Sequence, residues 1–181
     1  MQTFIDTKTQ KVWQFEEDVV VINTAGIYCF EAAHGMALST PTTLQPYTIP
    51  APTTAQLLAM AKVTQNTIIN TAAVTVITGG VSSSALGSAY LYPTKPTDQV
   101  NLTSNVVDSL MPASQTTGWT TPQMCKDSTG VWAYVAHSNV QIQQVGNDVK
   151  TGIASFLVKK NNLLNQITAA TTVTAVEAIV W

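Results

Sequence analysis

The chain has 181 residues, enough for one well-packed core or for a small module beside a medium-sized domain. Its net charge of −2 is too small for charge-driven binding to nucleic acid or acidic lipid, and all eight basic residues are lysine. Because arginine is the usual residue for paired hydrogen bonds to phosphates and bases, its absence counts against a nucleic-acid partner.

Charged residues are scarce in this sequence. They make up 10% of the chain, whereas about 25% is typical of a soluble domain. No charged residue lies between Glu31 and Lys62, where the polar positions are neutral. A monomer normally keeps itself soluble with charged side chains. We therefore expect a chain that buries much of its surface against partners. The alternative is a solvent-exposed surface that simply tolerates neutral polar residues in place of charged ones.

Residues 1–36 are expected to form a small β module. Runs of β-branched and aromatic residues predict strands at 3–5, 12–15, 19–22 and 27–30. So small a sheet is not stable alone, so we expect these strands to pair with or pack on a partner. The side chains that we assign to this contact are Trp13, Phe15, Val19 and Val21.

Residues 37–54 are expected to form a linker rich in proline and threonine. Pro41, Pro46, Pro50 and Pro52 fall within it, and such spacing favours extended backbone and forbids a helix. The linker separates the β module from a C-terminal domain at 55–181.

The C-terminal domain is predicted to combine a few antiparallel strands with one long helix. Periodicity and capping residues predict the following elements in chain order: a four-turn helix after Pro52, a strand at 74–77, a strand at 86–92, a short helix capped by Thr97 or Asp98, an irregular stretch at 112–130, a strand at 130–135, a seven-turn helix at 139–167 and a short helix near Thr174 and Glu177. The fold class is therefore α+β. A second contact surface is expected on the outer face of the long helix or at the C-terminal segment that ends in Trp181.

Two residue sets could indicate chemistry. Cys125 and His137 could form a nucleophile and its base, but no orienting group or oxyanion site accompanies them. Cys29 and His34 could join them in a zinc site, but the spacing matches no known ligand pattern. We therefore expect no catalytic residue, no metal site and no cofactor.

The aromatic residues leave another alternative open. Trp13, Trp119, Trp132, Trp181 and the tyrosines could stack on sugars in a receptor-binding protein, although packing in a core is the commoner role of tryptophan. No membrane span is expected, because Gly79, Gly80 and the serines at 82–84 interrupt the most apolar stretch, 72–92.

Several separated segments resemble a known group of proteins. The segments are 89–102 (AYLYPTKPTDQVNL), 125–132 (CKDSTGVW), 137–149 (HSNVQIQQVGNDV) and 169–181 (AATTVTAVEAIVW). Together they resemble an uncharacterised C-terminal domain of phage and prophage proteins encoded near tail-fibre genes. The stretches 4–9 and 12–19 are similar to the opening of such proteins. The resemblance covers about two thirds of the chain and carries no known functional residues.

The resemblance implies a bacteriophage tail origin. The small N-terminal sheet, the proline-rich linker and the charge-poor sequence favour a non-enzymatic structural protein of the tail, an adaptor close to the fibre or the baseplate. It would be made in the host cytoplasm and retained in the virion tail. Its expected partners are other tail or fibre proteins, in a homo-oligomer or a hetero-complex, with no nucleic acid and no membrane. The alternatives are a tail-fibre assembly factor that leaves the finished particle, or a receptor-binding module.

Overall fold

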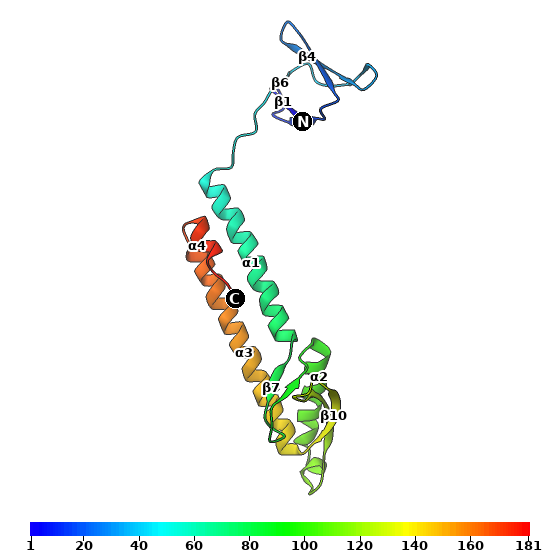
Figure 1. Ribbon diagram of the computed structural model, residues 1–181, viewed down its shortest axis with the longest axis vertical. Helices are drawn as coiled ribbons and strands as arrows, with labels where there is room; N and C mark the ends of the chain where they lie inside the picture. The colour runs from blue at the N-terminus through cyan, green and yellow to red at the C-terminus, as the bar shows by residue number, and fades with distance from the viewer. The chain divides into compact units, whose positions relative to one another are not determined.

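The computed structural model describes the whole chain, Met1–Trp181, as two compact units, Met1–Thr53 and Thr54–Trp181 (Figure 1). Antiparallel sheets and long helices both occur. The predicted α+β class is therefore confirmed. None of the helices combines the length and the hydropathy that a membrane span needs.

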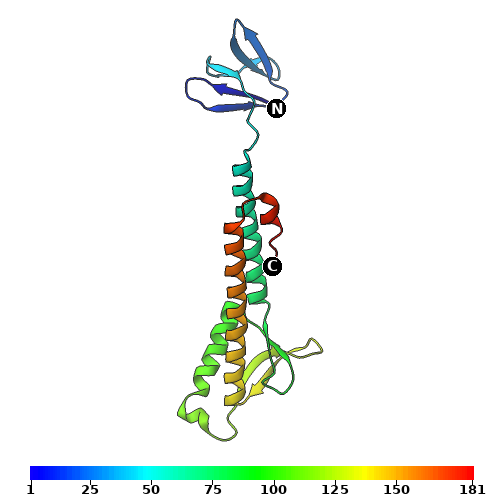
Figure 2. The same ribbon diagram turned by 90° about the vertical axis from the view of Figure 1, so that its left-hand side faces the viewer.

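The first unit contains two three-stranded antiparallel sheets, with the strand orders β2-β1-β6 and β3-β4-β5 (Figure 2). The strands are β1 (Gln2–Asp6), β2 (Val12–Phe15), β3 (Val20–Thr24), β4 (Ile27–Ala32), β5 (Met36–Ala37) and β6 (Leu44–Pro46). The four strands predicted for this region are all present. The connection between β3 and β4 is a two-residue turn in which Ala25 and Gly26 both have positive φ, as a type I′ turn requires.

An aromatic cluster holds the two sheets of this unit together. Phe4, Phe15, Phe30 and Leu44 are its buried members. The rings of Phe15 and Phe30 are stacked with centroids 4.1 Å apart, and Phe4 meets Phe30 edge-on at 4.8 Å. These residues come from β1, β2, β4 and β6, so the core forms only when both sheets are present.

The N-terminal module is longer than its predicted end at residue 36. β5 pairs with β4 across that boundary, and β6 pairs with β1 through Phe4 and Pro46. The prolines concealed β6, but it is an edge strand, where a proline without an N–H group is tolerated. The buried side chain of Leu44 fixes it to the core. The segment that follows the last strand of this unit and precedes α1 is residues 47–53.

The second unit consists of helices beside a four-stranded antiparallel sheet of order β10-β9-β8-β7. Its elements are α1 (Thr54–Thr78), β7 (Val81–Ser83), β8 (Tyr90–Tyr92), α2 (Pro96–Ser109), the 3₁₀ helix η1 (Pro112–Gln115), β9 (Thr121–Lys126), β10 (Trp132–His137), α3 (Asn139–Ala169) and α4 (Val173–Glu177). α1 and α3 lie antiparallel to each other (Figures 1 and 2). The predicted long helix is thus confirmed, and its cap, Ser138, accepts a hydrogen bond from the backbone N–H of Gln141.

Two hydrophobic clusters stabilise this unit. One forms where α2 and α3 meet the sheet and is built from Tyr92, Leu102, Cys125, Ile142, Val145 and Val149. The other joins α1, the C-terminal half of α3 and α4 through Ile69, Ile167 and Val176. Half-buried Trp181 packs against this second cluster.

Two local predictions for this unit are wrong. The stretch 74–77 belongs to α1 and not to a strand, because the helix continues to Thr78 before Gly80 adopts a positive φ. Burial of Ile69 and Ala73, four residues apart, favours the helix over the local β propensity. The stretch 112–130 contains η1 and β9 where irregular structure was expected. β9 was missed because two of its three inward residues, Thr121 and Gln123, are polar.

Candidate functional site

His137 and Cys125, the pair considered for nucleophilic catalysis, are both buried. His137 Nε2 lies 2.8 Å from the Tyr92 hydroxyl, and its Nδ1 lies 2.8 Å from the carbonyl oxygen of Val135. Burial raises the pKa of the Cys125 thiol and lowers the pKa of His137, so both side chains favour their neutral forms. The two ring nitrogens are already engaged in structural hydrogen bonds, so neither is positioned to accept a proton from the thiol.

The four residues considered as zinc ligands belong to different units. Cys29 and His34 lie in the first unit, where Cys29 is exposed on β4. Cys125 and His137 lie in the second. No group of three or more histidine, cysteine, aspartate or glutamate side chains is placed to hold a metal ion.

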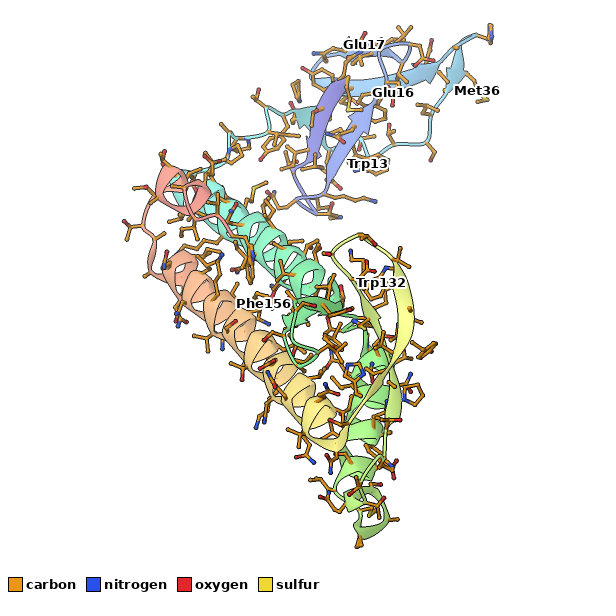
Figure 3. All side chains as sticks on the ribbon, turned by 60° about the horizontal axis from the view of Figure 1, so that its bottom comes forward. Trp13, Glu16, Glu17, Met36, Trp132 and Phe156 are labelled. Carbon is orange, nitrogen blue, oxygen red and sulfur yellow. The ribbon has the colours of Figure 1, made fainter.

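The expected contact residues of the first unit face its own core. Phe15 is buried, and Trp13, Val19 and Val21 pack against the same cluster. The apolar side chains left outside on β3 and β4 are those of Val20, Ile22 and Ile27. The structure therefore corrects the expected surface: the face of these strands that is open to a partner is the opposite one. Figure 3 labels Trp13 together with the neighbouring acidic residues Glu16 and Glu17.

A groove of about 660 Å³ lies between α2 and α3. Its floor includes Gly146, where an added Cβ would lie 2.8 Å from Cγ2 of Val106. The glycine thus lets the two helices approach each other closely. The lining is mainly apolar, with Val107 and Leu157 exposed along it and Lys150 beside them.

The most unusual surface of the second unit is the outer face of α1. This helix has 25 residues and a single charged side chain, Lys62, whose Nζ donates to the carbonyl oxygen of Thr168. Only Gln65, Ile69 and Ala73 are buried. The other sides of the helix expose Leu57, Met60, Val63, Ile68 and Val74 to solvent. A helix that is apolar on all sides is normally a buried one.

Part of this surface has the spacing of a helix-packing seam. Met60, Val63, Thr67, Asn70 and Val74 follow one another at intervals of three and four residues, the spacing by which one helix packs along another. The side chains of Met60, Val63 and Val74 are 62%, 67% and 60% exposed. We call these five residues the α1 seam.

The polar side chains on α1 add little polar character to this surface. The hydroxyl groups of Thr67, Thr75 and Thr78 each donate to the backbone carbonyl four residues earlier, and Asn70 Nδ2 donates to the carbonyl of Asn66. Because these donors are satisfied within the helix, the threonine methyl groups are free to contact an apolar partner.

Comparison of the chain with protein-family models, with curated proteins and with solved structures gives no match. The functional assignment therefore depends on the chain's own residues.

The α1 seam was not among the residues predicted from the sequence to make contacts. The expected surfaces were the N-terminal strands, the outer face of the long helix and the segment at Trp181. The available signal was the near absence of charge, because Lys62 is the only charged residue between Glu31 and Lys95. Predicting a strand at 74–77 divided the helix and concealed the seam, which continues through Val74.

Proposed function

We propose that this chain is a non-enzymatic structural protein of a bacteriophage tail, an adaptor near the fibre or the baseplate that acts by binding other tail or fibre proteins. The phage assignment is supported by the four sequence segments that resemble tail-associated proteins. The mode of action is supported by one structural observation, the apolar and almost uncharged outer face of α1.

The α1 seam is suited to a helical partner. Large exposed apolar patches on soluble proteins mark sites of association, because covering them removes apolar surface from water. The spacing of three and four residues presents a ridge that a second apolar helix can cover along its length. A helix of another copy of this chain would give a homo-oligomer, and a helix of a different tail protein would give a hetero-complex.

The first experiment is quantitative mass spectrometry of purified phage particles. A fixed copy number relative to a known tail protein is expected, and that number would give the symmetry of the binding position. A chain that is absent from particles but abundant in the lysate of infected cells would be an assembly factor, and the proposal of a virion component would be wrong.

A second experiment tests the surface itself. Val63→Lys and Val74→Lys each place a charge within the α1 seam, where desolvating the ammonium group opposes association. We expect both variants to remain folded and to be lost from particles. The matched control is Asn162→Lys, which adds the same charge at an exposed position of α3. Incorporation of all three variants at the normal level would show that α1 is not the contact surface.

A further inference from the structure

Exposed aromatic side chains are concentrated at one place in the second unit. Of the four tryptophans and five tyrosines, only Trp132 and Tyr134 are exposed, at 45% and 70%. They lie two residues apart on β10 and therefore share one face of the sheet. Lys126 and Met124 lie opposite them on β9. Figure 3 labels Trp132 on the β9–β10 hairpin.

Two adjoining pockets lie beside this pair. A pocket of about 320 Å³ is lined by Tyr134 and by the polar side chains of Asp98, Asn101, Asn105 and Gln123. A second pocket, of about 450 Å³, is lined by Trp132 and Lys95. Pro93, Asp98 and Met124 line both pockets, so the two pockets adjoin each other. Together they place two aromatic rings along one surface, next to a group of carboxylate and amide side chains.

The polar side chains of this surface are held in place and still have free hydrogen-bonding capacity. Asn105 Nδ2 donates to Gln123 Oε1 at 2.9 Å and Asn105 Oδ1 accepts from Thr121, which orients Gln123 and leaves its Nε2 group without a partner in the chain. Asp98 Oδ2 accepts from the backbone N–H of Lys95 at 3.0 Å, so its other oxygen remains available. The exposed side chain of Asn101 has no hydrogen bond within the chain.

This combination matches the chemistry of a sugar ring. A pyranose has a face of C–H groups that packs on an aromatic ring, and a rim of hydroxyl groups that each donate and accept hydrogen bonds. Amide and carboxylate groups satisfy such hydroxyls, because together they supply donors and acceptors in one place. A purely apolar protein partner would instead leave these polar groups unsatisfied.

We propose that the surface formed by Trp132, Tyr134, Asp98, Asn101 and Gln123 binds a neutral oligosaccharide, with the two rings stacking on sugar units and the polar side chains bonding their hydroxyls. A neutral ligand fits best because the surface carries charges of both signs, the carboxylate of Asp98 and the ammonium groups of Lys95 and Lys126. Lys126 Nζ lies 5.4 Å from the centroid of the Trp132 ring, which leaves the other face of that ring for a sugar. This surface and the α1 seam share no residue, so the two proposals stand or fall separately.

The test is a screen of the full-length chain against an array of neutral oligosaccharides, followed by calorimetric titration of each sugar that binds. We expect Trp132→Ala and Tyr134→Ala each to weaken binding at least about tenfold, since each removes a stacking surface. Trp132→Phe keeps an aromatic ring and should lose less. Asn101→Ala removes only hydrogen bonds and should weaken binding without altering the circular dichroism spectrum. Val158→Ala, at an exposed site on α3, is the control and should bind normally.

Three outcomes would overturn the proposal. One is an array on which no neutral sugar binds. Another is a sugar whose affinity is the same for Trp132→Ala, Tyr134→Ala and the unsubstituted chain. The third is the loss of a protein contact, instead of sugar binding, in these variants, which would assign the aromatic face to a protein partner. Because both rings are largely outside the core, their truncation should leave the fold intact, and the spectra of the variants verify this.

Discussion

The hydroxyl group of Tyr92 lies 2.8 Å from Nε2 of His137, and both side chains are fully buried. His137 Nδ1 faces the carbonyl oxygen of Val135, which can only accept, so Nδ1 carries the proton and Nε2 accepts from Tyr92. The contact ties the end of β8 to the end of β10, just before α3 begins. It satisfies two polar groups that would otherwise be buried without partners.

Replacing Tyr92 by phenylalanine should destabilise the second unit. The substitution keeps the ring but leaves Nε2 of His137 buried without a donor, which costs about 1–3 kcal/mol. Urea denaturation of Tyr92→Phe against the unsubstituted chain measures this difference in the free energy of unfolding. Tyr134→Phe, which removes an exposed hydroxyl, should change the free energy by less than about 0.5 kcal/mol. Equal stability of the two variants would contradict this account of the pair.

The same histidine makes the second unit sensitive to acid. Burial lowers the pKa of His137 in the folded chain below its usual value of 6.5. At a pH between the folded-state pKa and 6.5, the imidazole therefore binds a proton in the unfolded chain but not in the folded chain. The contribution of His137 to stability is therefore complete above pH 6.5 and is lost as the pH falls below it. Denaturation at pH 7.5 and pH 5, with an NMR titration of the imidazole, checks this. A His137 that titrates above 6.5 would show that the sign is wrong.

Asp6 should have the corresponding role in the first unit at lower pH. Hydrogen bonds from the hydroxyls of Thr43 and Thr9 and from the backbone N–H of Lys8 lower the pKa of Asp6 to about 2, from 3.8. Its contribution to stability is therefore present above pH 3.8 and is lost as the pH falls through about 2. Asp6→Ala should speed hydrogen exchange in β1 and β6 at neutral pH. Asp18→Ala, at an exposed site, should not.

Gly146 and Val106 should be energetically coupled. An alanine at 146 would place its Cβ 2.8 Å from Val106 Cγ2, so Gly146→Ala should push α2 and α3 apart and cost about 1–3 kcal/mol. Val106→Ala removes the obstructing methyl groups. The double variant should therefore be more stable than the sum of the two single changes predicts, and a double-mutant cycle measures the difference. Simple additivity would show that the helices adjust without strain.

The long helix was predictable because several local signals agree on it. The apolar positions from Ile142 to Ile167 keep helical spacing, and Ser138 supplies the cap. The strands of the first unit were predictable from their β-branched and aromatic runs for the same reason. Where elements were missed, the deciding contact was distant in sequence. β6 depends on the burial of Leu44 beneath β1 and β4, and β9 depends on Asn105 bonding the polar residues Thr121 and Gln123.

The contact surfaces were harder to predict than the elements. Strand alternation divides Val19, Val20, Val21 and Ile22 between two faces, and both faces are apolar. The covered face is decided by the sheet β2-β1-β6, whose edge strand β6 the prolines concealed. The aromatic residues pose the same difficulty. Local sequence does not show that Trp119 packs against a core whereas Trp132 is exposed.

The near absence of charge on α1 also determines how its association would respond to the solvent. Association through the seam releases no counterions and forms no ion pair that salt could screen. The reason is that Lys62 is the only ionic group on the helix and already donates to the carbonyl oxygen of Thr168. Moderate sodium chloride should therefore leave the complex intact, whereas salts that are excluded from protein surfaces, such as sulfate, should tighten it. An assembly held together by a helix of this kind should therefore tolerate wide changes in ionic strength.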